Sequence, residues 1–147
     1  MIYTESTTRA MWLAIAMHDK QKDKGGAPYI LHPIHVAEQM KTEEETIVAL
    51  LHDVVEDTSV TLSDLQYLGF SDEVVYAVDA ITKRDGEKWK DYIDRVKENR
   101  IARKVKIADL NHNSDLSRLC RPPTHDDLLR AERYKKAIIF LQSAKKL

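Results

Sequence analysis

Hydrophobic residues recur at helical spacing along nearly the whole chain, whereas sustained alternation of polar and apolar residues is scarce. This periodicity indicates amphipathic helices rather than half-buried β-strands. The pattern predicts helices at residues 7–22, from residue 32 onward, and at residues 42–57, 62–68, 72–82, 87–98, 100–119 and 124–144. The predicted fold class is therefore all-α.

Helix-breaking and capping residues set these boundaries. Gly25, Gly26 and Pro28 follow the first helix, and glycine and proline extend a helix only at a cost. Thr42, followed three residues later by Glu45, has the spacing of a capping box. The chain is thus expected to turn before residue 32 and to begin a new helix at residue 42.

Several residues outside any motif are expected to have only packing roles. We expect the large aromatic side chains of Trp12 and Phe140 to anchor the core. His18 is expected at the surface or at a helix cap. Cys120 is expected to be a packing residue, because no partner for a nucleophile is identifiable near it in the sequence.

Size and charge narrow the class of protein. The 147 residues fit one domain, expected over residues 1–147. Lys and Arg total 23 against 24 Asp and Glu, so no basic field favours a nucleic-acid or anionic-membrane partner. A single cysteine excludes an internal disulfide and a cysteine-based zinc site.

The start of the chain bears on its location in the cell. The longest early apolar run, residues 10–17, is too short to span a bilayer. The polar N-terminus also lacks the basic segment that opens a signal peptide. We therefore expect a cytoplasmic protein, and nothing in the sequence indicates its oligomeric state.

The most informative segment is the predicted helix that includes residues 46–57. Its apolar residues share one arc, and the opposite arc carries His52, Asp53, Glu56 and Asp57. Three carboxylates without an interspersed Lys or Arg repel one another, and a cation would relieve the repulsion. Imidazole and carboxylate donors suit Mn²⁺, Fe²⁺ or Zn²⁺. The alternative is an ordinary solvated helix face, which periodicity alone leaves open.

Two further places offer candidate ligands. His32 and His35 lie at the start of the second helix, one turn apart. Asp109, His112 and Asn113 share one helical face through their i, i+3 and i+4 spacing. Taken singly, such residues are typical of helix caps or solvated surfaces, so spacing alone leaves a metal site and a structural interpretation both open.

Three segments in this order resemble the HD-domain hydrolase of RelA/SpoT-type proteins. They are residues 28–37, reading PYILHPIHVA; residues 49–58, reading ALLHDVVEDT; and residues 106–113, reading KIADLNHN. Residues 80–83, reading AITK, lie where that family has a similar stretch. The order and spacing are similar to those of small, stand-alone alarmone hydrolases, and the resemblance covers about residues 7–120.

The resemblance implies an all-helical, typically Mn²⁺-dependent phosphohydrolase that removes the 3′-pyrophosphate from the alarmones ppGpp and pppGpp, giving GDP or GTP. By matching position it implies metal ligands at His32, His52, Asp53 and Asp109, water-activating acids at Glu56 and Asp57, and nucleotide contacts at Lys24 and Asn113. We also expect Tyr29 to pack under the site or to touch the base. The expected partner is a small-molecule nucleotide.

The chain departs from the family at the nucleotide contacts. Asp23 stands where the family has an arginine that contacts guanine, and an aspartate cannot stack or donate in that way. Leu110 and Asp115 stand where the family has two further arginines. These losses leave two alternatives to ppGpp hydrolysis: an HD-domain phosphohydrolase acting on another nucleotide or phosphoester, or a catalytically silent nucleotide-binding module.

Overall fold

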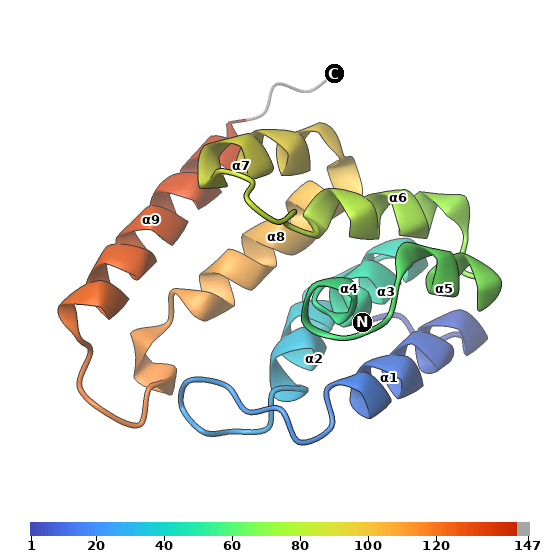
Figure 1. The fold of residues 1–147 in the computed structure, drawn as a ribbon, viewed down its shortest axis with the longest axis horizontal. Helices are drawn as coiled ribbons and strands as arrows, with labels where there is room; N and C mark the ends of the chain where they lie inside the picture. The colour runs from blue at the N-terminus through green and yellow to red at the C-terminus, as the bar shows by residue number, and fades with distance from the viewer. Residues whose placement is uncertain (144–147) are drawn as a thin grey trace.

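A computed structural model describes residues 1–143, and this part of the chain is helical with no β-strand (Figure 1). The elements are α1 (Glu5–Met17), α2 (Leu31–Glu38), α3 (Glu43–Leu51), α4 (Val54–Asp57), α5 (Leu62–Tyr67), α6 (Asp72–Ile81), α7 (Trp89–Glu98), α8 (Arg100–Asn113), the 3-10 helix η1 (Leu116–Arg118) and α9 (His125–Gln142). The all-α prediction is confirmed. Residue 144, the predicted end of the last helix, lies outside the described residues.

Helix α3 lies at the centre of the fold. It packs against α1, α2, α6 and α8, while α9 lies along α8 (Figure 1). The apolar run from Ile47 to Leu51 is buried on all sides, which explains why α3 is so hydrophobic for a short helix. No helix within residues 1–143 combines the length and the apolar character needed to cross a membrane.

The capping prediction at Thr42 is only half confirmed. The Thr42 side chain accepts a hydrogen bond from the Glu45 backbone N–H at 3.2 Å, as predicted. The Glu45 carboxylate instead accepts from the Lys41 N–H at 3.2 Å and pairs with Lys104 at 2.8 Å. Glu45 therefore ties the start of α3 to α8 rather than closing a capping box.

Three predicted helices end earlier than the periodicity indicated. The helix expected over residues 7–22 ends at Met17, and the helix expected over residues 100–119 ends at Asn113, where η1 follows after a short gap. The helix expected over residues 42–57 is interrupted between α3 and α4. At this interruption His52 Nδ1 lies 2.6 Å from the carbonyl oxygen of Ala49, which in a continuous helix would accept from Asp53.

The packing predictions for three residues outside the motifs are wrong. Trp12 is 67% exposed, because α1 turns its small residues Ala10 and Ala14 toward the core. Phe140 lies at the surface under the Lys97 ammonium, which is 4.0 Å from the ring centre. Cys120, expected to be a packing residue, is exposed. The helix-cap alternative for His18 is confirmed: His18 is the C-cap residue of α1, and its side chain is buried against Tyr29.

Arg95 holds the corner between α6 and α7 together. Its guanidinium donates to the carbonyls of Asp79 and Ala80 at 3.0 Å and to that of Thr82 at 2.9 Å. It also pairs with the Glu87 carboxylate at 2.8 Å, and these hydrogen bonds hold the pKa of Glu87 at about 2. Carbonyls at a helix end have no partner within the helix, so Arg95 acts as the C-terminal cap of α6.

We expect Arg95→Met to lower the free energy of unfolding by about 2–3 kcal/mol, because three helix-end carbonyls lose a charged donor. Denaturant unfolding measures the loss. Arg84→Met is the matched control, since Arg84 is exposed and only reaches Asp79 at 3.5 Å. Its loss should stay below about 1 kcal/mol. Equal losses for the two variants would contradict the capping role of Arg95.

Candidate active site

The four predicted metal ligands converge from separate parts of the fold. His32 comes from α2, His52 and Asp53 from the junction of α3 and α4, and Asp109 from α8. One ligand atom from each lies within 4.8 Å of all the others. Within residues 1–143 no other group of His, Cys, Asp or Glu side chains meets this condition. This arrangement could hold a divalent metal ion.

His52 provides the clearest test of whether a cation fits. Its side chain is 1% exposed, and its Nδ1 donates to the Ala49 carbonyl, which directs Nε2 into the cluster. Nε2 is buried and makes no well-aligned hydrogen bond, although Asp53 Oδ2 is only 3.0 Å away. Despite burial, the carboxylates of Asp53 and Asp109 hold the pKa of His52 well above its usual value. A buried nitrogen that attracts a proton this strongly fits a metal ion in the proton's place.

Asp109 is held by three neighbours. Its Oδ1 lies 2.9 Å from His32 Nε2 and accepts from Asn113 Nδ2 at 3.0 Å. Its Oδ2 pairs with the Lys106 ammonium at 2.7 Å. Burial would raise the pKa of Asp109, but Lys106 and the two imidazoles, His32 and His52, keep it well below the usual value. The carboxylate is therefore charged and fixed in direction.

Lys106 is a residue whose place the sequence interpretation missed. Its side chain is only 13% exposed and lies over the Tyr92 ring, 5.2 Å from its centre. The available signal was its position three residues before Asp109, which places the two on one helical face.

The acidic pair lies one turn beyond His52 and Asp53, on α4. Partial burial and the nearby carboxylates of Asp53 and Asp57 raise the pKa of Glu56 to about 7, against the opposing charge of Lys106. Burial and Asp53 also raise the pKa of Asp57. Both side chains still reach solvent. A carboxylate with a pKa near 7 can accept and release a proton at neutral pH.

Tyr29, His112 and His35 surround the cluster. The Tyr29 hydroxyl donates to Asp53 Oδ2, so Tyr29 orients Asp53, one of the predicted metal ligands. Tyr29 also lines the cavity beside His32 that is described in the next paragraph. His32 and His112 bring their Nδ1 atoms to 2.7 Å with parallel rings, and the His35 ring stacks on His112 at 3.9 Å. Burial and Arg118 lower the pKa of His112 to about 4, so this ring is neutral and suited to orient His32.

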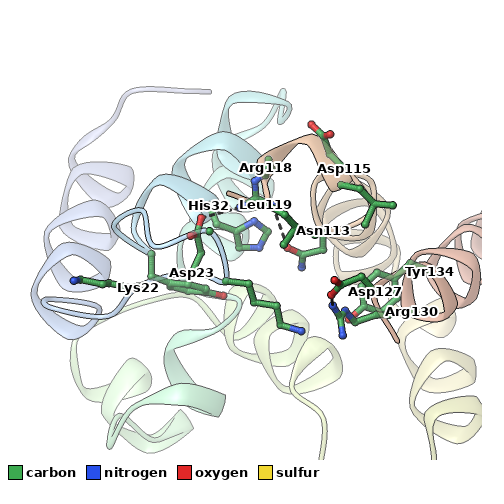
Figure 2. A pocket seen from close by; sticks show the side chains of 14 residues that line it. Lys22, Asp23, His32, Asn113, Asp115, Arg118, Leu119, Asp127, Arg130 and Tyr134 are labelled. Atoms are coloured by element: carbon green, nitrogen blue, oxygen red, sulfur yellow. Dashed lines mark hydrogen bonds and ion pairs between the residues drawn. The ribbon is translucent and has the colours of Figure 1, made fainter. Parts of the chain in front are cut away.

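A cavity of about 270 Å³ opens beside His32 (Figure 2). The three predicted nucleotide contacts, Lys24, Tyr29 and Asn113, all line it. Sequence interpretation missed other lining residues, among them Leu116, Arg118, Leu119, Arg130 and Tyr134. They lie outside the motif segments, and no local spacing connects them with the metal ligands.

Comparison with known proteins shows to which family this chain belongs. The family model described as HD domain matches residues 10–108. The bifunctional (p)ppGpp synthase/hydrolase SpoT of Escherichia coli (strain K12) is 36% identical over 121 residues, which cover 71% of this chain and 17% of SpoT. Guanosine-3′,5′-bis(diphosphate) 3′-pyrophosphohydrolase of Aquifex aeolicus (strain VF5) is 38% identical over 92 residues, or 60% of this chain and 13% of that protein.

This chain spans less than a fifth of the length of these two relatives. A solved structure described as "A metazoan ortholog of SpoT hydrolyzes ppGpp and plays a role in starvation responses" superposes with a TM-score of 0.78, at 24% identity. The superposition covers 99% of this chain and 90% of that one, and it shows the shared fold. The matched residues take in more than half of the chain, and this chain belongs to the HD domain family, with its similarity on the RelA/SpoT side of that family.

Proposed function

We propose that this chain is a metal-dependent phosphohydrolase, working as a single HD-type domain. Its proposed reaction removes the 3′-pyrophosphate of ppGpp or pppGpp and gives GDP or GTP and pyrophosphate. The observation that carries the proposal is the convergence of His32, His52, Asp53 and Asp109 within 4.8 Å beside a cavity. The names of the relatives, which include 3′-pyrophosphohydrolases, support the choice of substrate.

The proposed metal is Mn²⁺. Two imidazoles and two carboxylates suit a divalent ion such as Mn²⁺, Fe²⁺ or Zn²⁺, and the RelA/SpoT resemblance favours Mn²⁺. When bound, such an ion lowers the pKa of water and offsets the charge of phosphate oxygens. Lys106 and Tyr29 fix the directions of Asp109 and Asp53, so the ligands need little reorganisation to accept the ion.

Glu56 is the proposed proton acceptor, with Asp57 assisting it. In the reaction, the oxygen of a water molecule bonds to the phosphorus attached to the ribose 3′ oxygen, and the bond between that phosphorus and the 3′ oxygen breaks. The Glu56 carboxylate accepts one proton of the water, and the other stays on the oxygen that is now bonded to phosphorus. The departing 3′ oxygen takes up a proton from solvent, and Glu56 returns its own proton to solvent afterwards. A pKa of about 7 lets Glu56 serve as a base at neutral pH.

The cavity beside His32 is the proposed nucleotide site. Lys24 and Asn113 line it and carry donors suited to phosphate and sugar oxygens. Asn113 also donates to Asp109, so it connects the nucleotide site with the metal ligands. Tyr29 lines the same cavity and holds Asp53, which places it between the two.

The test is pyrophosphate release from ppGpp by the purified protein with Mn²⁺, beside an EDTA-treated sample. We expect release with Mn²⁺ and none with EDTA. Mn²⁺-dependent hydrolysis of other nucleotides in a panel, without hydrolysis of ppGpp, would contradict the substrate and keep the class of enzyme. Nucleotide binding without turnover under Mn²⁺, Fe²⁺ or Zn²⁺ would contradict the enzyme assignment and favour a silent binding module.

A further inference from the structure

Asp23 and Arg118 form an ion pair in the cavity, at the position where the family has an arginine. Asp23, which stands where the family has its guanine-contacting arginine, lies opposite Arg118 from η1. Arg118 Nη2 is 3.4 Å from Asp23 Oδ2, and the two side chains are 25% and 17% exposed. Figure 2 shows the two side chains turned toward each other beside His32. The Arg118 guanidinium therefore supplies a positive charge at this end of the cavity, from a position 95 residues after Asp23 in the chain.

Further contacts hold both members of the pair in place. Arg118 Nη1 donates to the His112 carbonyl at 2.9 Å and lies 3.5 Å from Asn113 Oδ1. Asp23 Oδ1 accepts from the Ala27 N–H at 2.9 Å. A guanidinium has five N–H donors and each carboxylate oxygen has two lone pairs, so both groups retain capacity for a ligand. Their directions are set before a ligand arrives.

Gly25 lets the two segments come this close. A Cβ atom at this position would lie 2.3 Å from the backbone oxygen of Arg118, closer than any real contact of that kind. The Gly25 carbonyl is also 2.8 Å from Cys120 Sγ. Glycine is therefore required for the loop that carries Asp23 to pack on the segment that carries Arg118.

The surrounding surface suits a planar base. Leu116, Leu119 and Tyr134 line the same cavity as Asp23 and Arg118. Apolar and aromatic side chains can cover the faces of a base while polar groups contact its edge. The cavity thus offers apolar side chains for the faces of a base and charged groups for its edge.

We propose that Asp23 and Arg118 together recognise the Watson–Crick edge of guanine and make the site specific for guanine over adenine. This inference rests on the proposed function, because it takes the cavity as the nucleotide site. Guanine presents one acceptor, O6, beside two donor groups, N1–H and N2–H₂. Arg118 donates to O6, and the Asp23 carboxylate accepts from N1–H and N2–H₂. Adenine N1 carries no hydrogen and its C2 carries no amino group, so both carboxylate oxygens are left without a donor. Its N6 amino group, a donor, stands where guanine has O6 and faces the donors of Arg118.

The test compares the dissociation constants of GDP and ADP for the full chain by isothermal titration calorimetry. Neither nucleotide carries a 3′-phosphate, so the measurement does not depend on turnover. We expect GDP to bind at least about tenfold more tightly than ADP, the worth of one or two charge-assisted hydrogen bonds. Asp23→Asn should reduce the difference to within about threefold, since the amide keeps an oxygen for Ala27 but donates where guanine also donates.

Two other variants complete the experiment: one tests the role of the Arg118 guanidinium, and the other is a control. Arg118→Lys keeps a positive charge and loses the planar fork, so it should weaken GDP binding while leaving ADP binding nearly unchanged. Asp126→Asn is the matched control on the exposed first turn of α9 and should keep the wild-type ratio. Melting temperatures verify that each variant is folded.

Equal affinities of the wild-type chain for GDP and ADP, or no binding of either, would overturn the inference. An unchanged ratio in the folded Asp23→Asn variant would do the same. Failure of the proposed function has a separate readout, namely the absence of Mn²⁺-dependent pyrophosphate release from ppGpp. A chain that prefers GDP but releases no pyrophosphate would support this inference and contradict the reaction.

Discussion

Asp53→Asn should lower turnover of ppGpp by more than about 100-fold and remove most of the stabilisation that Mn²⁺ gives the wild-type protein. Asp53 is one of only two carboxylates among the four converging side chains, and a neutral amide is a much weaker ligand for a hard divalent ion. Changes even to the groups behind a metal ligand cost about 10–100-fold, so loss of a ligand should cost more. Pyrophosphate release at saturating Mn²⁺ measures the first effect.

The second effect separates metal loss from misfolding. At a Mn²⁺ concentration 100 times its dissociation constant, binding stabilises a protein by about 2.7 kcal/mol, which thermal unfolding with and without Mn²⁺ detects. Asn fills the same volume and can still accept from the Tyr29 hydroxyl, so the metal-free variant should fold. Asp91→Asn, at an exposed position on α7, is the control and should keep both the activity and the Mn²⁺ effect. Wild-type values for Asp53→Asn would exclude Asp53 from the metal site.

The helical fold and the converging side chains could be predicted because both depend on local spacing and on recognisable motifs. Helical periodicity shows which residues share a face, and the His52–Asp53 segment stood out as a polar face on an unusually apolar helix. Periodicity could not show that α2 and α8 would cover that face. The alternative of a solvated face is wrong for His52, which is buried.

Contacts between distant segments were beyond the reach of the sequence. The pairing of Arg118 with Asp23 depends on how η1 packs on the loop before α2, and no periodicity records this. The sequence shows that Asp23 replaces the arginine of the family, but it does not show that Arg118 lies beside Asp23. Trp12 shows the same limit in the core: α1 buries alanines against α3, so the larger residue faces outward. A list of large apolar residues does not reveal which helix face needs small ones.

Glu56→Gln should lower kcat by about 10²–10⁴-fold, the usual contribution of a positioned general base. Gln has nearly the same shape as Glu and cannot accept a proton at neutral pH. The wild-type Glu56 carboxyl has a pKa raised to about 7, so it is protonated and inactive as a base below that value and competent above it. Turnover of the wild-type protein should therefore rise as pH increases through this region, and the variant should lack that rise. Initial rates across pH 5.5–8.5, chosen to bracket a pKa of about 7, measure both effects.

The variant must also keep its metal for this interpretation to hold. Glu56 is outside the group of four converging ligands, so Mn²⁺ should raise the melting temperature of Glu56→Gln as much as that of the wild-type protein. Glu73→Gln, at an exposed position on α6, is the control for loss of one negative charge. If Glu56→Gln keeps more than about a tenth of the wild-type kcat, the base is another group, and Asp57, whose pKa is raised by burial and by Asp53, is the next to replace. If Glu56→Gln instead loses the Mn²⁺ effect, Glu56 binds the metal, and its carboxylate is not available to take the proton from water.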